Sequence, residues 1–150
     1  MNKVKGACLW PARLLIFPVV VWNLQCAAVF LLNPSGFAPS FELEGVIGQS
    51  VIRSLAILFI MWNIPYLFAL FQPARYSISL VQALLMQAVG FIGESWLLTT
   101  LPVEYDILRG SIMRFMFFDG IGVPLLAAAL IIVLAARRKA GMRQGNLLSE

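Results

Sequence analysis

Long apolar blocks dominate the chain and predict helices that cross a membrane. Four blocks of mostly apolar residues are separated by segments that contain proline, glycine and charged residues. A helix needs about 20 apolar residues to cross the hydrocarbon core, whereas the helices of a water-soluble bundle would show polar stripes. We therefore expect an all-α integral membrane protein, a four-transmembrane-helix antiparallel bundle that forms a single domain. The expected spans cover about residues 14–32, 51–71, 79–101 and 110–136, followed by a basic tail at 137–150.

The charges that flank these blocks predict an orientation. One side of the expected bundle carries eight basic residues: Lys3, Lys5, Arg13, Arg75, Arg137, Arg138, Lys139 and Arg143. The connectors on the other side carry mostly acids: Glu42, Glu44, Glu104 and Asp106, with Arg109 as the one cation. Because positively charged connectors are retained in the cytoplasm, we expect both termini to be cytoplasmic. The expected location is a bacterial-type cytoplasmic membrane, crossed several times.

Composition narrows the chemistry further. The chain is 61% hydrophobic and 12% charged and contains no histidine, so it lacks the commonest general base and metal ligand. No serine nucleophile elbow, phosphate loop or metal-ligand spacing is present. We therefore expect no catalytic residue, no metal site and no cofactor. Cys8 and Cys26 lack C-x-x-C spacing and are expected to be free thiols that behave as small apolar residues.

The net charge of +4 indicates a lipid partner rather than nucleic acid, because most basic residues flank apolar spans. The last span is followed directly by a basic group: Arg137, Arg138, Lys139 and Arg143. We interpret this group as a topology signal, and binding of anionic lipid headgroups is the alternative. A homodimer or a larger membrane complex is the expected assembly if the chain transports a solute, because four helices enclose little space.

Four ionisable residues fall inside the expected spans: Arg53, Glu94, Arg114 and Asp119. Such residues are costly in lipid and usually face the protein interior. A rise of about 1.5 Å per residue places all four in the outer half of the bilayer. Because their charges sum to zero, we expect a cluster that joins spans 2, 3 and 4, with Glu94 paired to Arg53 or Arg114 and Asp119 paired to Arg53. Whether this cluster is structural or a ligand or ion site stays open.

The third expected span carries a small and polar stripe. Its members recur at spacings of four, three and four residues: Ala83, Gln87, Gly90 and Glu94. This spacing places them on one helix face, and small and polar residues are typical of helix contacts in membranes. We therefore expect Glu94 to face inward. Gly120 and Gly122 in the fourth span predict a close approach of another helix beside Asp119.

Three side-chain amides form a deeper layer, composed of Asn23, Asn63 and Gln87. Counting from the inner ends of the spans places all three near the midplane, within roughly 2 Å of one depth. Amides donate and accept hydrogen bonds, so we expect this layer to link helices. Three prolines lie inside the spans and predict kinks there: Pro18, Pro65 and Pro124.

The connector that follows the first span reads NPSGFAPSFELEG and is rich in proline and glycine. It also holds Phe37, Phe41 and two acids. Breaker residues of this kind are typical of exposed turns, so we expect an ordinary exposed connector rather than a lid.

Three functions remain open at this stage. The first is a non-catalytic accessory subunit or a binder of small apolar ligands, whose polar residues mainly hold the bundle together. The second is a proton- or ion-coupled small transporter that uses Glu94 and Asp119. The third is a membrane enzyme that acts on a lipid or isoprenoid substrate through one of these acids. The missing motifs favour the first.

Overall fold

The computed structural model describes residues 9–147, with side chains up to residue 141. Its elements, in chain order, are α1 (Trp10–Leu32), α2 (Pro34–Phe37), η2 (Ala38–Phe41), α3 (Gly45–Phe71), α4 (Ser77–Thr100) and α5 (Asp106–Leu147). Four of these helices, α1, α3, α4 and α5, are long and apolar enough to cross a membrane. The structure confirms the all-α four-helix fold, and its four apolar helices are those of a multi-pass membrane protein.

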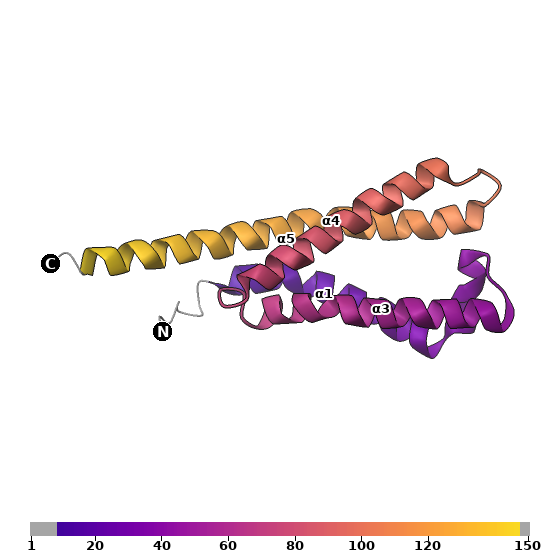
Figure 1. Cartoon of the computed structure of the whole chain (residues 1–150), viewed down its shortest axis with the longest axis horizontal. Coiled ribbons are helices and arrows are strands. Elements are labelled where there is room, and N and C mark those ends of the chain that lie inside the picture. Colours follow the sequence, from indigo (N-terminus) through magenta and orange to yellow (C-terminus); the bar gives the residue numbers. More distant parts are fainter. Residues whose placement is uncertain (1–8, 148–150) are drawn as a thin grey trace.

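The four long helices are arranged as two pairs. Figure 1 shows α1 and α3 along one side of the bundle and α4 and α5 along the other. α1 also packs against α5, and α3 against α4, whereas the backbones of the diagonal pairs do not come close together within the described residues. The beginning of α1 and the end of α5 lie at the same end of the molecule, which we call the terminal end (Figure 1). The opposite end holds α2, η2 and the α4–α5 connector, and we call it the loop end.

The helices continue through their internal prolines. Pro18 lies within α1, Pro65 within α3 and Pro124 within α5, and each helix is assigned without a break. Neighbouring helices in a membrane protein can satisfy the backbone carbonyls that a proline leaves free. The prolines therefore do not divide the spans.

Small side chains close the bundle toward its terminal end. Four alanines there are completely buried: Ala12, Ala69, Ala83 and Ala129. They belong to one apolar cluster with Ile16, Leu80 and Leu126, to which all four long helices contribute. Helices in lipid associate most closely where small residues let their backbones approach. This half of the bundle is therefore solidly packed.

Aromatic rings fill the loop end instead. Phe30 contacts the rings of Phe37, Phe41, Phe59 and Phe115, with centroid distances from 5.0 to 6.2 Å. These rings surround a second apolar cluster, built mainly on α1, η2 and α3. Bulky rings hold helices further apart than alanines do. The two helix pairs are thus joined differently at the two ends of the molecule.

The connector that forms α2 and η2 is folded against the bundle. The Ser111 hydroxyl of α5 donates a hydrogen bond to the Ser40 carbonyl at 2.5 Å, and the Leu108 amide donates to Glu42 Oε1 at 3.3 Å. Ala38 is buried, with 3% of its surface exposed. Several connector residues are exposed, as expected, but the connector is not an open loop, because its two prolines start short helices that pack Pro34 and Ala38 against the bundle.

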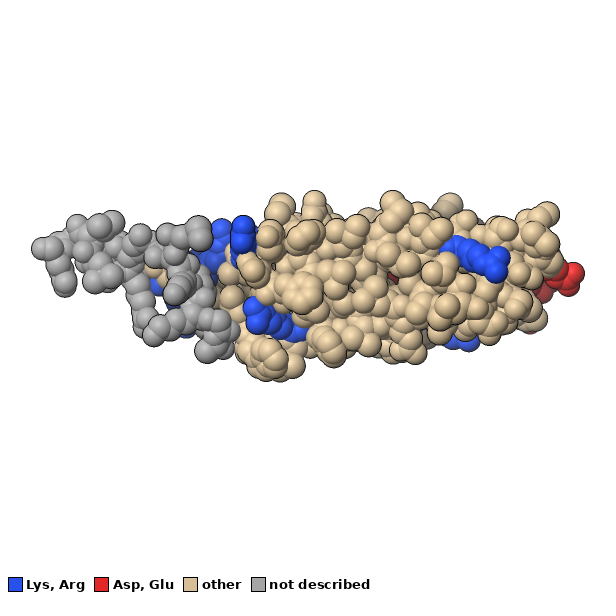
Figure 2. Space-filling view, turned by 90° about the horizontal axis from the view of Figure 1, so that it is seen from below, with Lys and Arg blue, Asp and Glu red and all other residues tan. Residues whose placement is uncertain are grey.

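Charged residues gather at the two ends of the molecule. Figure 2 shows a largely uncharged middle between blue Lys and Arg near the terminal end and, toward the opposite end, further blue residues followed by red Asp and Glu at the tip. Arg13 at the terminal end donates a hydrogen bond to the Phe71 carbonyl at 2.7 Å, and Arg137 donates to the Ser77 hydroxyl at 2.5 Å. Lys3, Lys5, Cys8 and the side chain of Arg143 lie outside the part of the chain that the structure describes.

Candidate functional site

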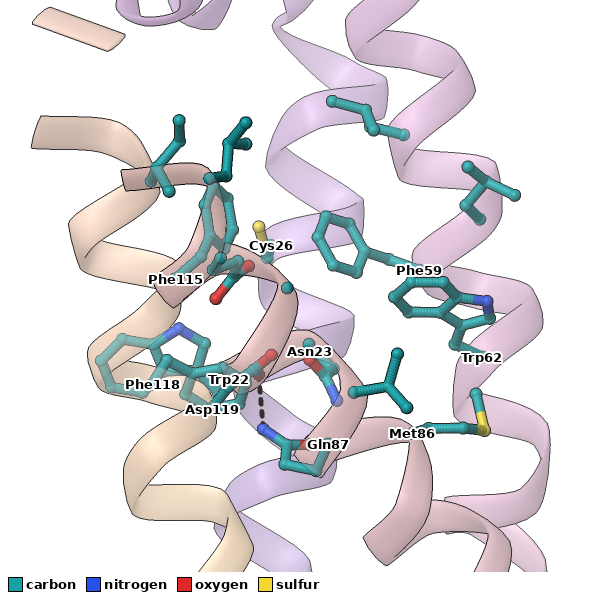
Figure 3. Close-up of a pocket in the computed structure, with 18 of the residues that line it drawn as sticks. Trp22, Asn23, Cys26, Phe59, Trp62, Met86, Gln87, Phe115, Phe118 and Asp119 are labelled. Atoms are coloured by element: carbon teal, nitrogen blue, oxygen red, sulfur yellow. Dashed lines mark hydrogen bonds between the residues drawn. The ribbon is translucent and has the colours of Figure 1, made fainter. Parts of the chain in front are cut away.

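A cavity of about 390 Å³ lies between the two helix pairs. All four long helices and η2 contribute to its lining. Figure 3 shows side chains from α1, α3, α4 and α5 directed into one space, with Trp22, Phe118 and Asp119 on one side and Phe59 and Trp62 facing them. The cavity follows from the packing described above, because alanines close the terminal end and aromatic rings separate the helix pairs toward the loop end.

Aromatic side chains form most of the cavity walls. Trp22 of α1 stacks on Phe118 of α5 at a centroid distance of 5.1 Å, so this pair bridges the two helix pairs. Phe59 of α3 stacks on Phe115 of α5 at 5.9 Å and meets Trp62 edge-on at 6.3 Å. Aromatic rings offer both apolar area and electron-rich faces to a guest molecule.

A chain of hydrogen bonds crosses the bundle at the bottom of the cavity. The Tyr66 hydroxyl of α3 donates to Gln87 Oε1 of α4 at 2.8 Å and also lies 3.0 Å from the Ala83 carbonyl. Gln87 Nε2 in turn donates to Asp119 Oδ1 of α5 at 2.6 Å (Figure 3). Three helices are therefore joined by one polar chain inside the bundle, and the amide fixes where the Asp119 carboxylate points.

Two glycines make room for this chain. A Cβ atom at Gly90 would overlap Asp119 Oδ2, and a Cβ atom at Gly122 would come within 2.5 Å of Gln87 Nε2. Each glycine thus lies against the polar side chain of the opposite helix. This reciprocal arrangement confirms the expected inward stripe on α4 and the expected close approach beside Asp119.

Glu94 lies one turn beyond Gly90 on α4 and also lines the cavity. Its Oε2 atom is buried and has no hydrogen-bond partner in the structure. The ionisable neighbour whose charge acts on Glu94 is Asp119, another acid, rather than an arginine. The cavity therefore contains two carboxyl groups, and one of them offers a buried oxygen without a protein partner.

The two arginines expected to pair with these acids lie elsewhere. Arg53 is exposed on α3 and does not line the cavity. Arg114 is exposed on α5 and donates to the Gly110 carbonyl at 3.3 Å and to the Ser111 hydroxyl at 3.0 Å. The expected pairing of Glu94 and Asp119 with these arginines was wrong, because residues at a similar depth can still point in different directions around their helices.

Arg114 instead lines a second cavity of about 390 Å³ nearer the loop end. The two cavities share four wall residues, namely Trp22, Cys26, Phe41 and Phe115. The lining of the second cavity includes Arg114, Ser111 and Gln25 but no acid within the described chain. Opposite charges therefore line neighbouring cavities and do not meet.

The expected amide layer links helices through one member only. Gln87 makes the interhelical bonds described above. Asn63 donates to the Phe59 carbonyl of its own helix at 2.8 Å, and its buried Oδ1 atom has no partner. Asn23 lines the cavity and is 9% exposed. The prediction of a helix-linking layer was therefore right for Gln87 and wrong for Asn63.

The site also includes Tyr66, which the sequence analysis did not single out. Its hydroxyl is the only phenol on the cavity wall among the described residues. The available signal was a tyrosine inside an apolar span, about one turn after a tryptophan–asparagine pair and five residues before the end of α3. Tyrosines at the ends of spans are common anchors, whereas a buried one within a span needs an internal partner.

The cavity is reached from the side of the bundle. Trp22 and Trp62, which line it, still expose 60% and 49% of their surfaces, and both lie in the middle of apolar helices. Figure 2 shows a small recessed red area midway along the uncharged flank, far from the acids at the ends. In a membrane this opening would face lipid rather than water.

The described residues contain no group of three His, Cys, Asp or Glu side chains that could hold a metal ion. No known protein family, curated protein or solved structure matches the chain. The geometry of the cavity is thus the basis for assigning a function.

Proposed function

We propose that this protein is a membrane-embedded, non-catalytic binding protein for a small, mostly apolar molecule. The observation that carries the proposal is the cavity of about 390 Å³ between the helix pairs. Ligand sites usually measure about 300–1,000 Å³ and combine apolar walls with a few convergent polar groups. Here aromatic rings supply the walls, while Gln87, Glu94 and Asp119 supply polar groups at one place.

The packing supports binding from the lipid phase. The terminal end of the bundle is closed by fully buried alanines and leucines, whereas the cavity is partly open at the flank through Trp22 and Trp62. An apolar molecule that is dissolved in the bilayer reaches such a site without crossing water. Binding would then bury apolar surface against rings and place one polar group beside the carboxylates.

We also propose, from the charge pattern of the sequence, that both termini face the cytoplasm of a bacterial-type cytoplasmic membrane. Basic residues at the terminal end and acids at the loop end support this orientation. Arg137, Arg138 and Lys139 are exposed beyond the packed part of α5, and we propose anionic lipid headgroups as their partners.

Gly93 offers a direct test of the binding proposal. It lines the cavity, and a Cβ atom placed there meets nothing within 4 Å, so Gly93→Leu adds a bulky side chain at the wall without a clash at its Cβ atom. Gly110 is a matched control, because it is equally open but does not line the cavity. Both variants leave the Tyr66–Gln87–Asp119 chain in place.

The test measures thermal unfolding of the full chain in a mild detergent with two small probes, neopentylbenzene and its charged isostere benzyltrimethylammonium. A probe present at 100 times its Kd stabilises the folded state by about 2.7 kcal/mol. We expect at least one probe to raise the Tm of the wild type and of Gly110→Leu by several degrees, and to leave Gly93→Leu unchanged. The proposal is wrong if neither probe raises the Tm, or if the filled cavity makes no difference.

A proton- or ion-coupled carrier is the second candidate, and the unpartnered Oε2 atom of Glu94 favours it. A carrier needs a group that exchanges its partner during transport, and an oxygen with no protein partner meets that need. The test is uptake of benzyltrimethylammonium into proteoliposomes under an imposed proton gradient. Uptake that is lost in Glu94→Gln supports a carrier, and binding without uptake restricts the protein to binding.

A further inference from the structure

We propose that the cavity selects a hydrophobic organic cation, that is, an amine or quaternary ammonium group attached to an apolar or aromatic body. This inference rests on the proposed binding function and adds the charge of the ligand. It is carried by the combination of two carboxyl groups, aromatic faces and the absence of any basic side chain from the described lining of the cavity.

The described lining of the cavity contains two acids and no basic residue. Glu94 and Asp119 are the ionisable acids of the cavity, and the basic side chain of Arg114 lines the second cavity instead. Uncompensated carboxylates in a site of low dielectric are costly. A cationic guest offsets this cost, whereas an anionic headgroup would add to it.

The two carboxyl groups differ in how much of their hydrogen-bonding capacity is used. Asp119 Oδ1 accepts from Gln87, and its Oδ2 lies against Gly90. Glu94 Oε2 is buried and accepts from no group of the protein. Asp119 is thus held in place, and Glu94 is the group that is ready to accept a hydrogen bond or an ion pair from a ligand.

The aromatic walls suit the rest of such a ligand. Trp22, Phe59, Trp62, Phe115 and Phe118 all line the cavity. Cations are attracted to the faces of tryptophan, tyrosine and phenylalanine rings, and quaternary ammonium groups are commonly bound in aromatic cages. The same rings bury the apolar body of the ligand.

A bare metal cation fits these walls poorly. Calcium takes six to eight oxygen ligands and magnesium demands near-octahedral geometry. The oxygens that line the cavity come from Glu94, Asp119, Gln87, Asn23 and Tyr66, and the Gln87 and Tyr66 oxygens are already engaged with one another. The remaining walls are apolar, so a cation that brings its own apolar surface is the better match.

Glu94→Gln provides the decisive variant, because it removes the charge while keeping the size of the side chain. The control is Glu104→Gln, an equally conservative change of an exposed acid in the α4–α5 connector. Equilibrium dialysis of radiolabelled benzyltrimethylammonium against the purified full chain gives the Kd of each protein. We expect Glu94→Gln to weaken binding at least tenfold, equivalent to about 1.4 kcal/mol, and Glu104→Gln to bind as the wild type does.

The two isosteric probes give a second measurement that depends on no variant. Neopentylbenzene has the shape of benzyltrimethylammonium without its charge, so we expect the cation to raise the wild-type Tm more than the neutral probe does. Equal or greater stabilisation by neopentylbenzene, or unchanged cation affinity in Glu94→Gln, would overturn the inference and leave a site for neutral ligands. If Gly93→Leu changes the Tm shift of neither probe, the proposed binding function itself is wrong.

Discussion

The Asp119 carboxylate of α5 lies directly against Gly90 of α4, at a point where a Cβ atom would overlap Asp119 Oδ2. This contact brings a half-buried acid to the wall of the cavity without moving the two helices apart. Gln87, three residues earlier on α4, donates to the other oxygen of the same carboxylate at 2.6 Å. One helix thus provides both the space and the hydrogen bond that orient Asp119.

Gly90→Ala should therefore destabilise the protein. The added methyl group must displace Asp119, and overpacking of this kind typically costs about 1–3 kcal/mol. Gly93→Ala is the matched control, because its Cβ atom meets nothing within 4 Å. Both changes alter the helical backbone equally, so the difference in unfolding free energy between them, measured by titration with a denaturing detergent, isolates the contact. Equal stability of the two variants would contradict the close contact.

Tyr66, Gln87 and Asp119 should behave as one unit. Gln87→Met leaves the Asp119 carboxylate without its amide donor, and a buried polar group that loses its partner typically costs about 1–3 kcal/mol. Tyr66→Phe removes the other end of the chain and should cost less, because one hydroxyl is lost without leaving a charge unpaired. The double variant should cost less than the sum of the two, by about 0.5 kcal/mol or more.

The same unfolding titration measures this coupling, and Gln82→Met serves as its control. Gln82 is an exposed glutamine on the same helix, so its replacement should change stability little. Strictly additive costs for Gln87→Met and Tyr66→Phe would show that the hydrogen-bonded chain does not act cooperatively.

The orientation in the membrane is open to direct labelling. In a background that lacks Cys8 and Cys26, single cysteines at Gln72 and Val103 report on the α3–α4 and α4–α5 connectors, and both positions are exposed. Retention of basic segments in the cytoplasm predicts that an impermeant maleimide labels position 103 on intact cells and labels position 72 only after lysis. The reverse pattern would invert the proposed orientation.

Much of the fold can be predicted from the sequence because lipid imposes simple requirements. Apolar length gives the four spans, and helical spacing places Gln87, Gly90 and Glu94 on one inward face, where the structure has them. These inferences need only the geometry of a single helix. They hold because a polar stripe in lipid has few places to point other than toward another helix.

The partners of the acids could not be predicted in the same way. Depth along a helix follows from residue counting, but the direction around the bundle depends on how the helices rotate and lean against one another. Arg53 and Arg114 are at suitable depths and yet lie exposed, away from Glu94. A tyrosine on another helix, Tyr66, completes the polar chain instead.

The cavity itself depends on a contrast between the two ends of the bundle. Completely buried alanines such as Ala12 and Ala129 bring the helices together at one end, and rings such as Phe30 and Phe115 hold them apart at the other. Both residue types are visible in the sequence, but only their positions in three dimensions show that an open space remains between them.

The central claim, that a small molecule occupies the space between the two helix pairs, is tested most directly by magnetic resonance contacts between probe and protein. The measurement records intermolecular nuclear Overhauser effects from the methyl protons of benzyltrimethylammonium to the aromatic protons of the full chain. We expect contacts to Trp62 of α3 and Phe118 of α5 together, and their loss in Gly93→Leu. Contacts confined to outward-facing rings such as Trp96, or contacts that persist after the cavity is filled, would contradict it.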